Sequence, residues 1–222
     1  MEHKIKMLQV YERFCSAEGN QHIASEYAIL KLQHVIRKFD IKNVLEVGLG
    51  IGSIAGTLIR VNENLNYTGT EINPFCLKSL STNIGSNYER LRIHPDLRTV
   101  PANKNFDLAI VDGNDVNLKS LKKMLSKRGM IVLEGDRLNQ QKELQDLFPR
   151  HKIVHSISLR KNKSYSPFPE EEWQGGLKII FINPSRSQNA WWLKEKILTM
   201  LKYQFPGRHF GVEDLKVKKP KN

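Results

Sequence analysis

The sequence contains little cysteine, and its two cysteines are far apart. Cys15 and Cys76 are the only cysteines in 222 residues, and they do not have the close spacing of metal-binding thiols. Two isolated cysteines build neither a disulfide scaffold nor a zinc site. We therefore expect a reduced, cytoplasmic setting.

Long hydrophobic runs are also missing. No apolar stretch approaches the roughly 20 residues that a membrane-spanning helix needs, and the start, "MEHKIKMLQVYERF", lacks the apolar core of a secretory signal. A composition of 40% hydrophobic and 26% charged residues is typical of a soluble globular protein. The length suits one α/β domain, which we expect to span residues 1–222.

Acidic residues are too few to balance the basic residues of the second half of the chain. Residues 112–222 contain 22 Lys and Arg against 12 Asp and Glu, whereas residues 1–111 contain 13 against 11, within a net charge of +12. Such asymmetry can attract nucleic acid, an anionic membrane or phosphorylated substrates. A lysine-rich solvated face is the simpler alternative, and both remain open.

What the sequence does contain is a regular alternation of strands and helices. The apolar spacing predicts helices, the first with Ser25 as its N-cap, over residues 25–39, 53–62, 74–85, 118–129 and 139–148. Short apolar runs predict strands over residues 42–48, 66–71, 90–96, 106–113, 130–136, 152–159 and 177–183. This order predicts a mostly parallel sheet with helices on both faces and a final antiparallel hairpin at one edge.

We expect four parts within the single domain. They are an N-terminal helical segment (1–40), a core (41–184), a C-terminal helix (185–205) and a basic tail (206–222).

In the predicted C-terminal helix, one apolar stripe is formed by Ala190, Leu193, Ile197, Met200 and Leu201. Trp191 and Leu198 fall on another face of the helix. A docked helix, a homodimer contact and an interfacial membrane helix are the alternatives for this segment.

A glycine-rich turn follows the first predicted strand. The stretch "VLEVGLGIGS" has glycine at positions 48, 50 and 52, and such a turn lets the backbone adopt positive φ and approach a ligand closely. A phosphate-binding loop would continue with lysine, and the dinucleotide fingerprint would need glycine where Ser53 stands. The acid Glu46 within the strand suits a ligand with a positive charge. Glu71, at the end of the second predicted strand, can accept both hydroxyls of a ribose.

Over residues 43–136 the chain resembles the class I S-adenosylmethionine (SAM)-dependent methyltransferases. The segments that match that family's five motifs, in order, are "VLEVGLGIG", "YTGTEIN", "IHPDLRTV", "FDLAIVDGND" and "KRGMIVLEGD". The resemblance implies a seven-stranded Rossmann-like sheet, with Asp96 near the adenine amino group. The residues it implies around SAM are Glu46, Gly48, Gly50, Gly52, Ser53, Glu71, Ile72, Asp96, Leu97 and Asp112.

Acidic residues follow the fourth and fifth predicted strands, where we expect them to converge beside the donor methyl group. They are Asp112, Asp115, Glu134 and Asp136. Of these, Asp112 and Asp136 are the candidate catalytic residues, because methyl transfer needs alignment and a deprotonated nucleophile.

The segment "DLAIVDGND" is similar to the small-molecule O-methyltransferases of the catechol and caffeoyl-CoA type, which implies a divalent cation such as Mg²⁺. Asp112 matches the first ligand, but Gly135 stands where the second would be, so Glu134 and Asp136 are the other candidate ligands. Without a metal, Asp112 or His155 is the candidate general base.

The resemblance therefore implies a SAM-dependent methyltransferase, and we expect O-methylation of a small molecule or a glycan. An RNA-directed methyltransferase, suggested by the basic half, and a non-catalytic SAM-binding protein are the alternatives. The loop at 160–176, which carries Phe168 and Trp173, is either a lid over the acceptor or an exposed hairpin loop.

Overall fold

The structure is a computed structural model that describes residues 2–135 and 137–205. Asp136 and the predicted basic tail, 206–222, lie outside the described residues.

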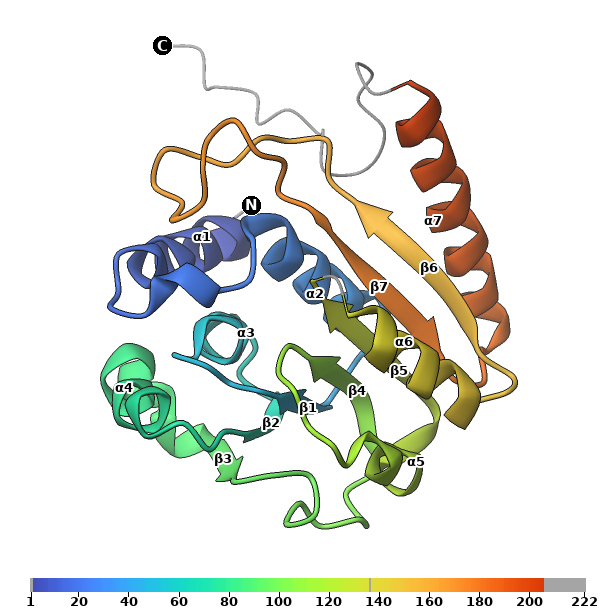
Figure 1. The fold of residues 1–222 in the computed structure, drawn as a ribbon, viewed down its shortest axis with the longest axis horizontal. Coiled ribbons are helices and arrows are strands. Elements are labelled where there is room, and N and C mark those ends of the chain that lie inside the picture. Colours follow the sequence, from blue (N-terminus) through green and yellow to red (C-terminus); the bar gives the residue numbers. More distant parts are fainter. Residues whose placement is uncertain (1, 136, 206–222) are drawn as a thin grey trace.

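One seven-stranded sheet organises the chain (Figure 1). In chain order its strands are β1 (Asn43–Val47), β2 (Asn66–Thr70), β3 (Leu91–His94), β4 (Phe106–Val111), β5 (Leu125–Glu134), β6 (Lys152–Ile157) and β7 (Gly176–Phe181). Their order across the sheet is β3-β2-β1-β4-β5-β7-β6, and only β7 runs antiparallel to its neighbours. The predicted fold class, including the edge hairpin, is confirmed.

Helices cover both faces of this sheet (Figure 1). Buried residues of one cluster belong to α1 (Glu2–Cys15), α2 (Glu26–Lys38), α3 (Ser53–Val61), α4 (Pro74–Ile84) and α7 (Arg186–Gln204). A second cluster contains residues of α5 (Leu121–Met124) and α6 (Leu138–Leu147). No helix within the described residues has both the length and the apolar character needed to cross a bilayer.

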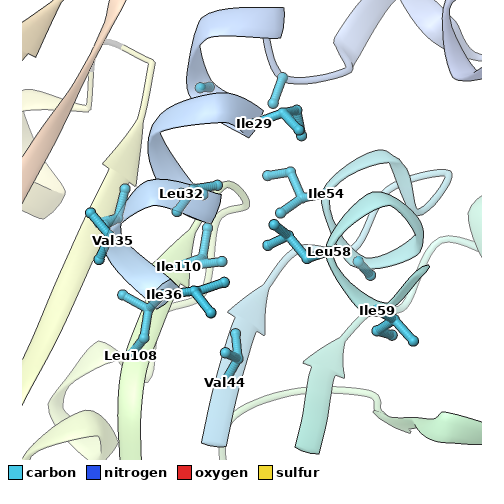
Figure 2. Close-up of a cluster of buried hydrophobic side chains, with 14 of the residues drawn as sticks. Ile29, Leu32, Val35, Ile36, Val44, Ile54, Leu58, Ile59, Leu108 and Ile110 are labelled. Atoms are coloured by element: carbon cyan, nitrogen blue, oxygen red, sulfur yellow. The ribbon is translucent and has the colours of Figure 1, made fainter. Parts of the chain in front are cut away.

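Successive residues of a strand belong alternately to the two clusters, because side chains in a β-strand point to opposite faces of the sheet in turn. Val44 and Leu108 point to the first cluster, whereas Leu45 and Ala109 point to the second. Figure 2 shows the first cluster where α2 and α3 meet β1 and β4. Each buried Leu or Ile there stabilises the fold by about 1.5–3 kcal/mol. This packing holds the carboxyl ends of β1 and β4 in place.

Local signals set the ends of two helices as predicted. The Ser25 hydroxyl oxygen accepts a hydrogen bond from Ala28 N at 3.2 Å and caps α2. Pro74 begins α4, and Gly85 ends it with φ at +63°, a conformation that glycine adopts most easily.

The predicted helix over 118–129 is wrong in its second half. A short turn at Leu118–Ser120 is followed by α5, which ends at Met124. Gly129 lies inside β5. Leu125 pairs with Phe106 of β4, and the ladder shifts register before Met130 pairs with Leu108. Burial of Leu125 beside β4 therefore overrides the helical periodicity of this segment.

The apolar stripe of the C-terminal helix does not form its inner face. Leu193, Ile197 and Met200 of this stripe are 51%, 45% and 51% exposed. Trp191 is instead buried, with edge-on aromatic contacts to Phe39 and Phe181. The helix does dock on the sheet, but a tryptophan and several partnered polar side chains form its inner face.

A buried ion pair joins this inner face to α2. Lys31 Nζ lies 3.2 Å from Glu195 Oε2, which also accepts a hydrogen bond from the Ser156 hydroxyl at 2.8 Å. Replacing Glu195 by alanine would leave a buried ammonium without its carboxylate. We expect Glu195→Ala to lower the free energy of unfolding by about 3 kcal/mol. Urea denaturation measures this, with Lys194→Ala on the exposed face as control; equal midpoints for the two variants would contradict it.

Candidate active site

The sheet changes its direction of winding between β1 and β4, and the loops after these strands touch. A side chain at position 48 would clash, because a Cβ on Gly48 would lie 2.5 Å from Gly113 Cα. Gly113 N donates to Val47 O at 2.6 Å, which keeps the two loops together. In open α/β sheets, ligands bind at such a switch point.

The other two glycines of the turn differ from each other. A Cβ on Gly52 would lie 2.8 Å from Leu80 Cδ2, whereas a Cβ on Gly50 would meet nothing within 4 Å. Gly48, Gly50 and Gly52 all have positive φ, as predicted. Close packing thus explains Gly48 and Gly52, and only Gly50 has open space in which a ligand can lie against the backbone.

Glu71 is fixed beside this open space. Its Oε2 accepts a hydrogen bond from Gly50 N at 2.8 Å, and its Oε1 accepts from Ile72 N and Asn73 N, both at 2.8 Å. Three backbone donors therefore hold one carboxylate at the carboxyl end of β2, next to the glycine turn. The predicted neighbour Ser53 begins α3 and is buried.

Asp96, predicted to contact the adenine, and Leu97, predicted to lie near SAM, are on the loop after β3. Asp96 is held by Arg98, whose Nη2 donates to Oδ2 at 2.6 Å and lowers the pKa of that carboxyl. Leu97 has its side chain in the core and its N–H bonded to Asp115 Oδ2 at 3.0 Å. Ile72, after β2, is 73% exposed and offers an apolar surface.

Glu46 is fully buried beneath the turn. Tyr67 donates its hydroxyl proton to Glu46 Oε2 at 2.5 Å, and Oε1 has no hydrogen-bond partner among the described residues. Burial raises the pKa of Glu46 well above its usual range; the Tyr67 bond opposes this, and the charges of Asp112 and Glu71 add to it. Burial therefore favours the protonated, uncharged form of Glu46.

This proton makes stability depend on pH. Because the folded pKa of Glu46 is raised, its contribution is fully present below the unfolded pKa of about 4.3 and is lost as pH rises toward the folded pKa. In that window the unfolded state gains about 1.4 kcal/mol per pH unit over the native state. We expect Glu46→Gln, which cannot ionise, to match the wild type at pH 4 and to exceed it increasingly above pH 5 in urea unfolding. A constant difference across this range would contradict the assignment.

A cleft of about 520 Å³ opens beside the turn, at the ends of β4 and β5. Its lining residues come from three separate loops and from the end of β5: His22, Ile23, Ser25, Asp112, Gly113, Asn114, Glu134, Arg137, Asn162, Phe168, Glu172, Trp173 and Gln174. Gly50 and Glu71 are not among them. The site therefore has two adjoining parts, a shelf at Gly50 and Glu71 and a cleft at Asp112.

Two carboxyl groups meet at the base of the cleft. Asp112, just after β4, and Glu134, at the end of β5, both line the cleft. Burial raises the pKa of both groups, and the charge of Glu134 raises that of Asp112 further, against the opposing effect of Arg137. Both shifts favour the protonated, uncharged forms of the two carboxyl groups.

The guanidinium of Arg137 joins the same cluster. Its Nε donates to Glu134 O at 2.8 Å, its Nη1 to Asn114 Oδ1 at 3.3 Å, and its Nη2 to the carbonyl oxygen of Asp112. Arg137 Nη2 also lies 3.5 Å from Asp112 Oδ1. Sequence reasoning missed this residue, because only acids were sought at the ends of these strands.

These contacts do not fit the divalent cation that the resemblance implies. Within residues 2–135 and 137–205, no three His, Cys, Asp or Glu side chains come together as metal ligands. Of the predicted set, Asp112 and Glu134 are adjacent, and Asp136 lies outside the described residues. A positive guanidinium already faces Asp112, and it would repel a second cation.

Two histidines are placed differently relative to the cleft. His155, the predicted alternative base, is an exposed residue of β6 and does not line the cleft. His22, at the end of a short turn before α2, does line it. No local pattern points to His22, because its position depends on how the N-terminal segment crosses the ends of the strands.

The loop at 160–176 closes one side of the cleft. Phe168 and Trp173 both line it, and Lys161 Nζ lies 3.8 Å from the centre of the Trp173 ring. The Tyr165 hydroxyl donates to Glu26 of α2, which ties the loop to the N-terminal segment. Of the two predicted alternatives, this placement favours a loop that covers the acceptor side.

No family model matches the sequence, and no curated protein is similar to it. Solved methyltransferases nevertheless share its fold. An O-methyltransferase from Bacillus cereus in complex with S-adenosylhomocysteine (SAH) is 14% identical, with 82% of this chain and 91% of that one covered at a TM-score of 0.56. A SAM-dependent O-methyltransferase from Thermotoga maritima is 18% identical (75% and 68% covered, TM-score 0.56).

A precorrin-6y C5,15-methyltransferase from Geobacter metallireducens is 16% identical, with 76% of this chain and 94% of that one covered at a TM-score of 0.57. The protein therefore has the Rossmann-like fold of the class I SAM-dependent methyltransferases.

Proposed function

We propose that the protein is a SAM-dependent methyltransferase that methylates an oxygen of a small molecule or a glycan. The observation that carries the proposal is the position of Glu71. Three backbone N–H groups hold its carboxylate at the switch point, beside Gly50, which of the three glycines in the turn is the one that faces open space. A carboxylate in this position is suited to a ribose diol.

The ribose position at Glu71 determines where the adenine, the methionine part and the methyl group of SAM lie. With the ribose at Glu71, the adenine lies between the exposed side chain of Ile72 and the loop at Asp96. The methionine part lies along Gly50, above Glu46. The sulfonium methyl group then points to the cleft, where Asp112 and Glu134 contribute negative charge. An acidic surrounding favours a cationic donor over a pyrophosphate.

The reaction is an in-line displacement. The acceptor oxygen attacks the methyl carbon, an O–C bond forms, and the C–S bond breaks with its electron pair retained on sulfur, which leaves the neutral thioether SAH. The hydroxyl proton passes to a carboxylate oxygen of the Asp112–Glu134 pair or to His22 and then to water. Alignment of the two substrates supplies most of the rate.

The comparisons support this proposal at the level of the donor. The similar structure from Bacillus cereus is an O-methyltransferase in complex with SAH, and that from Thermotoga maritima is a SAM-dependent O-methyltransferase. The Geobacter metallireducens enzyme is named as a C5,15-methyltransferase, so the fold by itself does not fix the acceptor atom. The choice of oxygen depends on the motif "DLAIVDGND" and on the acidic cleft behind it.

The test is transfer of a labelled methyl group from SAM to a panel of phenols, catechols, sugars and amines. We expect at least one hydroxyl compound to be methylated with stoichiometric release of SAH. Methylation of amines alone would contradict the choice of oxygen. SAM binding without turnover on any compound would favour the non-catalytic alternative.

An RNA-directed activity, a homodimer and a cytoplasmic setting stay predictions. RNA is the candidate that the basic second half suggests, and its affinity would fall steeply with salt because each neutralised phosphate releases a counterion. Indifference to RNA at low salt removes this alternative. Sedimentation of the full chain tests the homodimer.

A further inference from the structure

The guanidinium of Arg137 bridges the loops that frame the cleft. Its three nitrogen atoms donate to oxygens of Asp112, Asn114 and Glu134, which follow or end two neighbouring strands, β4 and β5. Only an arginine side chain offers several donors in one rigid plane, so a lysine would not reproduce this set of contacts. Arg137 and Asp112 are both mostly buried, with side-chain exposures of 22% and 15%.

One oxygen that a cation would need, Asp112 Oδ1, already faces the guanidinium. Mg²⁺ takes oxygen ligands at about 2.0–2.1 Å in a near-octahedral arrangement. The carbonyl oxygens of Asp112 and Glu134 already accept from Arg137, and Asp112 Oδ1 lies 3.5 Å from its Nη2. A divalent ion bound at Asp112 would therefore have a fixed positive charge as its neighbour.

We propose that Arg137 takes the place of a divalent cation in this cleft, so that the protein transfers methyl groups without a metal. The inference depends on the proposed function. Arg137 is a positioning residue: it holds the carbonyl oxygen and the carboxylate of Asp112 against the end of β5, and it supplies the positive charge that balances the Asp112–Glu134 pair. The acceptor hydroxyl is then aligned by a carboxyl pair that the guanidinium keeps in one arrangement.

The first test is a titration of the full chain with Mn²⁺, followed by electron paramagnetic resonance. We expect the wild type to bind no Mn²⁺ in the cleft below millimolar concentration, and its turnover to survive a chelator. Binding of one Mn²⁺ at micromolar concentration that Asp112→Asn abolishes, or loss of turnover on chelation, would overturn the proposal. The Mn²⁺ titration does not need SAM. The proposal about Arg137 can therefore be contradicted in a protein that binds SAM, and it can be supported in a protein that does not.

The second test uses Arg137→Gln, Arg137→Lys and the control Lys142→Gln, which removes an exposed positive charge from the same helix. We expect Arg137→Gln to keep SAM affinity within about threefold, to lose roughly 100-fold in kcat, and to bind Mn²⁺ at least tenfold more tightly than the wild type. Arg137→Lys keeps the positive charge, so it should still bind Mn²⁺ weakly, but its kcat should stay close to that of Arg137→Gln. Unchanged kcat and Mn²⁺ affinity in Arg137→Gln would overturn the proposal.

Discussion

Replacing Gly50 by alanine should weaken SAM binding by at least about tenfold, equivalent to 1.4 kcal/mol, in a protein that still folds. The added Cβ meets no protein atom within 4 Å, so it enters the space that we assign to the ligand. The backbone there has φ at +53°, and an alanine in this conformation costs about 1–2 kcal/mol of stability. Calorimetric titration with SAM and a thermal melt separate the two effects.

The control for this substitution is Gly85→Ala. Gly85 has φ at +63° and also has open space around the Cβ position, but it is the C-cap of α4 and is not part of the glycine turn. Both variants should lose a similar amount of stability, and only Gly50→Ala should lose donor affinity. Equal SAM affinity in the two variants would show that no ligand lies against Gly50.

Removing the Glu71 carboxylate should have an effect of similar size on the donor. Glu71→Ala leaves two ribose hydroxyls and three backbone N–H groups without their acceptor. We expect a loss of about 1–3 kcal/mol in binding free energy, or roughly 5- to 150-fold in Kd. The same titration measures it.

Glu63→Ala is the matched control, since Glu63 is an exposed acid in the turn after α3. It removes one negative charge, as Glu71→Ala does, without touching the site. If the two variants bound SAM equally well, the ribose would lie elsewhere. A loss in Glu71→Ala alone supports a specific contact.

The turn and its acid were predictable because their signals are local. Three glycines after an apolar run and an acid at the next strand end occupy consecutive elements, and parallel neighbours bring them together. Ser25 as an N-cap and Pro74 at the start of α4 are local signals too. Such features depend on few residues, so one sequence suffices to find them.

The errors arise where tertiary contacts override a local pattern. The Lys-rich stretch from Leu118 to Gly129 has helical spacing, but pairing of Leu125 with Phe106 turns its second half into a strand. In α7 the apolar stripe of Leu193, Ile197 and Met200 lies on the exposed face, because Trp191 packs against Phe39 and Phe181 instead. Phe106 and Phe39 are not sequence neighbours of the segments that they contact.

The residues of the cleft were also difficult to predict from local sequence patterns. His22, Phe168 and Arg137 belong to segments that meet only after folding, so the acids could be found from the sequence but the guanidinium that balances them could not. The role of Gly48 was also misjudged in part: it was expected to face a ligand, and it makes room for Gly113. A close approach between two loops has no signature in either loop alone.

The most direct measurement is a titration of ¹⁵N-labelled protein with SAH, followed through its amide resonances. A bound donor product should shift the N–H groups of Gly50, Glu71, Ile72 and Asn73 at one-to-one stoichiometry, because these groups surround the ribose position. No change at millimolar SAH, or changes confined to residues away from the ends of β1 and β2, would contradict the account.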